Sequence, residues 1–404
     1  MLIELHLLQN FAPSNLNRDD TGAPKDCELG GHRRARISSQ SIKRAIRQTF
    51  KSEELLADEH LASRTKRAAQ AIADRLVAHD GNRTQADATV VAGALLNSIK
   101  GGLHNAADGK TQYLLFLGGA ELDGAASVAA EHWDALLAAA NAPADDKAKK
   151  AAAAKKGAGN APTSAVRAEL IKKLDGGRSA DLALFGRMIA DLPEQNKDAA
   201  SQVAHAISTN RVSMEMDFYT AVDDLKPDDT AGADMLGTIE FNSACFYRYS
   251  NVDLAQLRRN LQDDEGLARE TLKAFLWSSI LAIPTGKQNS MAAHNPPSLI
   301  LAVARESGPW NLANAFVQPV RPQQRRTDEP GADLVAESVT ALDTYWGKLT
   351  AMYGTRGILG SWLCTTEPER LSTLRGADVQ TVDALVAQVL GAASFADRAR
   401  GGRS

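Results

Sequence analysis

Cysteine and long hydrophobic runs are scarce in this sequence. The 404 residues include three cysteines, Cys27, Cys245 and Cys364, which are far apart. Their odd number and wide spacing fit neither a zinc motif nor a disulfide framework. No apolar run approaches the roughly 18 residues that a membrane helix needs, and the first residues, MLIELHLLQNFAPSN, lack the basic leader and cleavage site of a secretory signal. We therefore expect a reduced, cytoplasmic protein without a membrane association.

The sequence motifs of common enzymes are also missing. The eight histidines are scattered without HExxH or another paired metal-ligand spacing, and no serine lies in a GxSxG turn. Gly286 and Lys287 lack the other residues of a phosphate-binding P-loop. We therefore expect no catalytic residues, no cofactor and no resident metal.

Acidic residues are absent from one window of the chain. Between Glu28 and Glu53 there is no carboxylate, and the window carries seven cationic residues: Arg33, Arg34, Arg36, Lys43, Arg44, Arg47 and Lys51. A solvated helix face normally carries both signs of charge, which limits self-repulsion. Because the whole chain has a net charge of −3, this window of +7 leaves −10 for the remainder. We interpret the window as a local surface for an anion.

The cationic window predicts a helix that begins near Ser38, a good N-cap residue. Ile42, Ile46 and Phe50 then recur at helical spacing and form one apolar stripe. The lysines and arginines lie on the neighbouring stripe. One face of this helix can therefore pack on a sheet while its flank presents cations to a ligand.

Other segments predict a mixed architecture. Leu2 to Phe11 reads as a strand, and the turn-rich stretch from Ala12 to Gly31 predicts a long loop. Alanine-rich helical segments fill Glu53 to Phe185, and within them the Ala/Lys tract Asn141 to Ala165 reads as a mobile connection. Strand-like sequence returns at Met235 to Tyr249.

The C-terminal part repeats the alternation of helix and strand. We expect helices at Leu267–Ile283, Leu334–Met352 and Val379–Leu390, and a buried strand at Pro297–Ala304. Strands and helices at both ends, separated by a helical block, predict an α+β domain with a helical insertion.

Three aspartates cluster in the predicted N-terminal loop. Asp19, Asp20 and Asp26 offer the oxygen ligands that a divalent cation prefers, as metal-dependent cleavage of a nucleic acid requires. They can equally cap turns or pair with Arg18 and the arginines that follow. The sequence leaves both interpretations open.

Several blocks of sequence closely resemble the repeated backbone subunit of the type I-E CRISPR surveillance complex Cascade, the CasC family. The most specific is FAPSNLNRDDTGAPKDCELGGHRRARISSQSIKRAIR, from Phe11 to Arg47. Further blocks follow in the family's order: AHAISTN from Ala204, DFYTAVDDL from Asp217, LGTIEF…FYRYSNVDLAQL from Leu236, and ANAF from Ala313. The resemblance covers nearly the whole chain and is weakest in the helical block.

The resemblance implies a fold with three parts. The palm has a modified RNA-recognition (ferredoxin-like) fold, formed here by residues 1–52 and 243–404. Residues 53–200 would form the helical fingers insertion, including the low-complexity tract 141–165, and residues 208–242 a long thumb hairpin.

The resemblance also implies a set of RNA-binding residues. Those that match guide-backbone contacts of the family are Arg18, Lys25, Ser38, Gln40, Lys43, Arg44 and Arg47, and the basic window adds Arg33 and Arg34. Lys287 and Gln288 are weaker candidates for backbone contact.

Three further residues are implied to contact bases. Met188 would wedge against the bases at a kink of the guide, although it also suits the core of a helix. Phe218 and Tyr219 of the thumb would cover a base step, or pack the hairpin onto the palm.

The family relationship implies a non-catalytic function. Several copies polymerise along the spacer of a CRISPR RNA and present it for pairing with invading target DNA. The implied partners are CRISPR RNA, target DNA, further copies of the chain, and the Cascade subunits that cap the 5′ handle, hold the 3′ end and form the large and small subunits. Two alternatives remain: a metal-dependent ribonuclease backbone subunit like those of type III complexes, and a stand-alone RNA-recognition protein.

Overall fold

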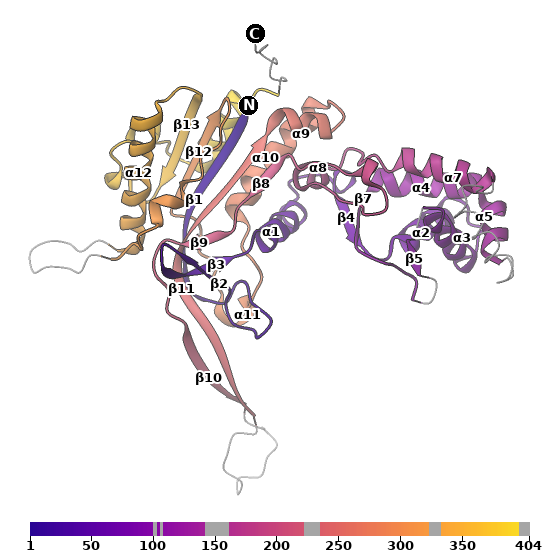
Figure 1. The fold of residues 1–404 in the computed structure, drawn as a ribbon, viewed down its shortest axis with the longest axis horizontal. Coiled ribbons are helices and arrows are strands. Elements are labelled where there is room, and N and C mark those ends of the chain that lie inside the picture. Colours follow the sequence, from indigo (N-terminus) through magenta and orange to yellow (C-terminus); the bar gives the residue numbers. More distant parts are fainter. Residues whose placement is uncertain (100–102, 106–107, 142–160, 222–234, 323–332, 396–404) are drawn as a thin grey trace, which may run out of the picture. The chain divides into compact units, whose positions relative to one another are not determined.

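The computed structural model describes residues 1–99, 103–105, 108–141, 161–221, 235–322 and 333–395 (Figure 1). The chain divides into two compact units. A sheet unit consists of residues 1–55, 201–255 and 269–404, and a helical unit consists of residues 56–200 and 256–268. No helix in the described ranges is long and apolar enough to cross a membrane.

The sheet unit is built on one antiparallel sheet with the order β13-β12-β1-β11-β9-β3-β2, and β8 and β10 also pair with β11. The strands are β1 (Leu2–Ser14), β2 (Asp26–Leu29), β3 (His32–Ile37), β8 (Ser201–Val203), β9 (Ala206–Ser208), β10 (Glu215–Ala221), β11 (Met235–Asp253), β12 (Leu299–Arg305) and β13 (Ile358–Thr365). The predicted strands at residues 2–11, 235–249 and 297–304 are confirmed within a few residues.

The central strand β1 is buried on both faces, which explains its nearly continuous apolar sequence. Leu8 points into a core cluster with Leu342 and Trp346, on the side of α12 (Leu334–Tyr353). Leu5 and Leu7 alternate to the opposite face. Figure 1 shows α12 on one side of the sheet and α1 and α10 on the other.

The other helices of the sheet unit are α1 (Ser39–Ser52), α11 (Gln288–Met291) and α13 (Val382–Ala392). Two helices belong to both units: α9 (Leu254–Asn260) begins in the sheet unit and continues into the helical unit, and α10 (Glu265–Leu281) begins in the helical unit and continues into the sheet unit. The helices predicted near residues 267–283, 334–352 and 379–390 are confirmed. Helix α1 begins as predicted, because the Ser38 hydroxyl accepts a hydrogen bond from the Ser41 N–H. Ile42, Ile46 and Phe50 form its buried stripe.

The long loop predicted from residue 12 to residue 31 is wrong in part. Strand β1 continues to Ser14, and β2 and β3 form a hairpin in register, with Leu29 opposite His32. Gly30 and Gly31 make its two-residue turn with φ angles of 61° and 75°. Such a turn requires two residues with positive φ, and a Gly-Gly pair between short strands is the signal that indicates it.

A second hairpin extends β11 beyond the main sheet. Residues Asn242–Asp253 of β11 face β1, whereas Met235–Phe241 pair with β10, with Glu215 opposite Phe241. This hairpin lies where the thumb is expected. The acidic part of the predicted thumb, residues 223–234, lies outside the described residues.

The helical unit contains small helices around an alanine-rich core that includes Ala69, Ala92, Leu95 and Leu122. Its helices are α2 (Ala68–His79), α3 (Gln85–Asn97), α4 (Gly119–Glu131), α5 (Trp133–Asn141), α7 (Ala161–Lys173) and α8 (Ala180–Phe185). It also has two short strand pairs, β4 (Ala62–Thr65) with β7 (Leu115–Gly118) and β5 (His104–Asn105) with β6 (Lys110–Thr111). Most of the predicted Ala/Lys tract, residues 142–160, lies outside the described residues.

A buried polar network crosses the core of the sheet unit on the α12 side. Glu4 accepts hydrogen bonds from the Tyr249 hydroxyl at 3.0 Å and the Trp310 N–H at 2.5 Å. Burial raises the pKa of Glu4 to about 7, although these two donors and the nearby Arg305 oppose that rise. The neighbouring His6 is wholly buried, and this lowers its pKa to about 3.

The raised pKa of Glu4 predicts a stability that falls with pH. The fold prefers the neutral carboxyl, so its contribution is full below pH 4.5 and is lost as the pH rises through about 7. One pKa unit is worth about 1.4 kcal/mol. The free energy of unfolding of Glu4→Gln, taken relative to that of wild type, should therefore rise by about 2 to 3 kcal/mol between pH 5 and pH 8. Urea unfolding at both pH values measures this difference. The titration of His6 is common to both proteins and cancels, and a constant difference would contradict the assignment.

Candidate nucleic-acid interface

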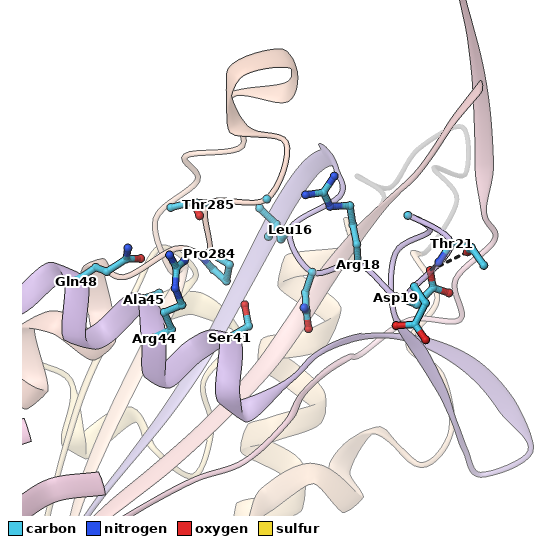
Figure 2. A pocket seen from close by; sticks show the side chains of 14 residues that line it. Leu16, Arg18, Asp19, Thr21, Ser41, Arg44, Ala45, Gln48, Pro284 and Thr285 are labelled. Carbon is cyan, nitrogen blue, oxygen red and sulfur yellow. Dashed lines mark hydrogen bonds between the residues drawn. The ribbon is translucent and has the colours of Figure 1, made fainter. Parts of the chain in front are cut away.

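A polar cleft of about 550 Å³ lies on the sheet unit between three segments: the loop 16–22, the first turns of α1 and the loop 284–286. Figure 2 shows Arg44 and Gln48 projecting from α1 beside Pro284 and Thr285, with Arg18 on the N-terminal loop. The cleft therefore brings together Arg18 and Arg44, two of the predicted RNA-binding residues.

Backbone contact between two of these segments fixes the floor of the cleft. A Cβ atom on Gly286 would meet the carbonyl oxygens of Leu16 and Asn15, the latter at 2.7 Å. Only glycine permits so close an approach. Asn15 itself donates from its side chain to the carbonyls of Gly22 and Glu240, both at 2.9 Å, which ties the N-terminal loop to β11.

The N-terminus of α1 adds a favourable field for an anion. The Ser38 N–H donates to the Asn17 side chain at 2.8 Å, so the loop and the helix start are joined. The first turn carries no acid, and a helix N-terminus attracts negative charge. Gln40 and Arg44 are exposed, and Lys43 and Arg47 are half-buried along the same helix. The predicted Ser38 is buried, and its side-chain oxygen caps the helix.

Arg34 is a correction to the predicted interface. Its side chain is fully buried, and its guanidinium donates to four backbone carbonyls. The acceptors are Ser208 at 3.0 Å, Thr209 at 2.7 Å, Phe316 at 2.7 Å and Val317 at 3.1 Å. Arg34 therefore joins β3 to two distant segments and has no surface for RNA.

Gln288 is half-buried at the start of the short helix α11, in the segment between α10 and β12. Its Nε2 donates to the carbonyls of Pro284 at 3.2 Å and Ala293 at 3.3 Å, and its contact with RNA stays a prediction. It stabilises the loop that walls the cleft. The neighbouring Lys287 is half-buried with a left-handed backbone, φ 52°.

The three aspartates have separate structural environments. The Asp19 carboxylate accepts hydrogen bonds from the Thr21 hydroxyl at 2.7 Å and the Thr21 N–H at 2.9 Å, which hold its pKa below the usual range. Asp26 forms an ion pair with the exposed Arg33, and Asp20 is exposed on the rim of the cleft. In the described ranges these aspartates do not form a trio at metal-binding distance; Glu131, His132 and Glu169 do.

Comparison with known proteins identifies the family. The sequence profile described as CT1975-like protein matches residues 3–389, which is most of the chain. The chain belongs to the CT1975-like protein family. A search of curated proteins finds no match.

Two solved structures similar to this CT1975-like protein are chains of CRISPR complexes. A chain of a "CRISPR RNA-guided surveillance complex, pre-nicking" has a TM-score of 0.79 and 29% identity, over 97% of this chain and 100% of that one. A chain of a second "CRISPR RNA-guided surveillance complex" has a TM-score of 0.69 and 25% identity, with the same coverage. The resemblance to a subunit of a CRISPR surveillance complex is thereby confirmed, and the type I-E assignment stays a prediction.

In this CT1975-like protein Met188 is not a helix-core residue. Helix α8 ends at Phe185, because Gly186 adopts a φ of 75°. Met188 is 79% exposed on the loop that follows. The loop is closed by reciprocal backbone hydrogen bonds between Arg187 and Lys197, at 3.0 and 2.9 Å.

A buried ion pair holds the base of that loop. The Arg187 guanidinium donates to both Glu121 oxygens, at 2.7 and 2.9 Å, and to the carbonyl of Leu174 at 2.9 Å. Glu121 also accepts from the N–H groups of Gly118 and Gly176. The exposed Met188 therefore lies on a firmly held loop, and its contact with a base stays a prediction.

The two thumb aromatics differ in their surroundings. Phe218 is 74% exposed and shares one face of β10 with Met216, which is 64% exposed. The ring of Tyr219 covers Gly237, its cross-strand neighbour. Phe218 therefore offers an uncovered aromatic face, whereas part of the Tyr219 ring is occupied within the hairpin.

Sequence reasoning missed the partners of the basic residues. Arg36 was counted in the basic window but not singled out, and His205 was one of the scattered histidines. The structure places Arg36 Nη1 at 3.2 Å from His205 Nδ1, although 169 residues separate them in the chain. Only the fold brings these two side chains together, so no local signal reveals the pair.

Proposed function

We propose that this chain is a non-catalytic backbone subunit of a type I-E CRISPR Cascade complex in the cytoplasm. Several copies bind along the spacer of a CRISPR RNA and present it for pairing with target DNA, together with the other Cascade subunits. The observation that carries the proposal is a polar cleft lined by Arg18 and Arg44, in a chain whose fold matches, over 97% of its length, a chain of an RNA-guided complex.

The geometry suits a protein that holds RNA by its backbone. Arg18 and Arg44 reach the cleft from two different segments, and the α1 N-terminus adds a positive field. Contacts of this kind bind phosphates and carry no sequence information. In this proposal the sheet unit is the palm with a modified RNA-recognition fold, the helical unit is the fingers, and the β10–β11 hairpin is the thumb. Base pairing by the guide then supplies the specificity.

The ribonuclease alternative is tested with the assembled complex. Asp19 and Asp20 are both exposed and line the cleft. Asp19 already holds a turn and Asp26 an ion pair, so Asp20 is the aspartate to replace. We expect no divalent-dependent cleavage of a matched target RNA by wild type or by Asp20→Ala. Cleavage by wild type that Asp20→Ala abolishes would favour the enzyme.

The stand-alone alternative is tested by sequencing the RNA that co-purifies with the chain. CRISPR RNA should be recovered, whereas a mixture of cellular RNAs would favour the stand-alone RNA-recognition protein.

A further inference from the structure

A second group of cationic side chains lies outside the cleft on the same unit. Strand β3 pairs with β9, with Arg36 opposite Ile207, and His205 directly precedes β9. Lys25 directly precedes β2, and its carbonyl accepts a hydrogen bond from the Arg36 N–H at 2.9 Å. Three segments of the chain thus bring Lys25, Arg36 and His205 together at one edge of the sheet.

Hydrogen bonds fix how this group presents its donors. Arg36 Nε donates to the Asp26 carbonyl at 3.0 Å, which holds the guanidinium plane. Because a guanidinium only donates, His205 Nδ1 is the acceptor of the 3.2 Å contact with Arg36, and the neutral ring carries its proton on Nε2. Within the described part of the chain, Lys25 Nζ, Arg36 Nη2 and His205 Nε2 have no hydrogen-bond or ion-pair partner.

The charge of this group is not compensated by nearby acid. The adjacent carboxylate, Asp26, forms an ion pair with Arg33. Burial, Arg36 and Lys25 hold the pKa of His205 below its usual value. The charged groups that act on His205 are Arg36 on β3 and Lys25 on the loop before β2, and Asp26 and Cys27 of β2 lie near Arg36. Convergent donors with excess positive charge favour an anion.

The group continues the wall of the cleft. The Lys25 N–H donates to the Asn17 carbonyl at 2.8 Å, and Asn17 lines the cleft beside Arg18. We propose that Lys25, Arg36 and His205 form a second anion site that binds one phosphodiester group of an RNA strand lying in the cleft. This site rests on the proposed function, and it adds Arg36 and His205 to the residues that hold the RNA.

Salt-dependent binding of single-stranded RNA to the full chain tests the site. For single strands, each neutralised phosphate contributes about −0.7 to the slope of log K against log salt. Arg36→Gln should therefore reduce the magnitude of the slope by up to about 0.7, for any RNA sequence. The control Lys348→Gln also removes one positive charge, from an exposed position on α12, and should leave the slope unchanged. An unchanged slope in Arg36→Gln would overturn the site.

His205 gives a readout that survives if Arg36→Gln fails to fold. A bound phosphodiester offsets the positive charges of Lys25 and Arg36, so the pKa of His205 should rise when RNA binds. RNA affinity should therefore fall as the pH increases through the range in which His205 loses its proton. His205→Gln should weaken binding at pH 6 by about threefold, the value of one modest hydrogen bond, and should flatten the pH dependence. The control His79→Gln changes an exposed histidine at the end of α2. NMR of labelled histidines follows the pKa directly.

Two outcomes separate this site from the proposed function. If RNA binding needs Arg18 and Arg44 but RNA leaves the pKa of His205 unchanged, the site is wrong and the proposed function stands. If the wild-type chain binds no RNA, both are wrong. Inorganic phosphate at the same concentration of phosphate groups should shift the pKa of His205 much less than RNA does. An equal shift of the pKa would mean that the site binds free phosphate instead of an RNA strand.

Discussion

Arg34→Leu is expected to lower the free energy of unfolding by about 3 to 5 kcal/mol. The substitution removes the guanidinium donor from four backbone carbonyls, those of Ser208, Thr209, Phe316 and Val317. The Thr209 carbonyl keeps a second donor, the Val320 N–H at 2.9 Å. All four acceptors face a guanidinium that is fully buried, and a buried acceptor without a partner costs about 1 to 3 kcal/mol. Urea denaturation of the purified chain measures the loss.

The neighbouring arginine provides a matched control. Arg33 has a half-exposed side chain, 55%, and one ion pair with Asp26, so Arg33→Leu should cost less than about 1 kcal/mol. A variant Arg34→Leu that kept wild-type stability but bound RNA with a smaller salt slope would contradict this account. It would restore the interpretation of Arg34 as an RNA contact.

Replacing Arg18 and Arg44 together by glutamine should weaken RNA binding about 25-fold at 0.1 M salt. Two lost phosphate contacts lower the magnitude of the salt slope by about 1.4, and the two binding curves then converge near 1 M salt. Both side chains are exposed in the cleft, so the melting temperature should not change. Fluorescence anisotropy with a labelled single strand measures affinity and slope.

A double control removes the same charge elsewhere on the sheet unit. Arg356 and Arg375 are exposed near β13, and their joint replacement by glutamine should leave the slope unchanged. An equal loss of RNA affinity in both double variants would mean that net charge, not the cleft, governs binding. An unchanged slope in the Arg18 and Arg44 variant would mean that the cleft is a solvated surface.

The sequence was sufficient to predict the elements whose signals are local. Helix α1 was predicted because its cap, Ser38, and its apolar stripe of Ile42, Ile46 and Phe50 lie within one short segment. The β2–β3 hairpin also had a local signal, the pair Gly30-Gly31, which was attributed to a loop. The resemblance to a CRISPR complex subunit rested on long motifs in a fixed order, and the comparison confirms it at that level.

Burial could not be predicted where the partners are distant in the chain. A basic window does not reveal which of its arginines is buried, because the carbonyls that accept hydrogen bonds from Arg34 lie 174 to 283 residues away. Met188 followed an apolar run that suits a helix, but the left-handed Gly186 ends α8 and leaves the methionine exposed. The pairing of Arg36 with His205 depends on the register of β3 with β9, which is set by the whole sheet.

The mass of the complex formed with CRISPR RNA tests the central claim most directly. The chain would be co-expressed with guides of two spacer lengths and the other Cascade subunits, and the purified particles measured by native mass spectrometry. Several copies of this chain per guide are predicted, with more copies on the longer spacer, because each copy holds a fixed length of RNA backbone. One copy per RNA at both lengths would contradict the account.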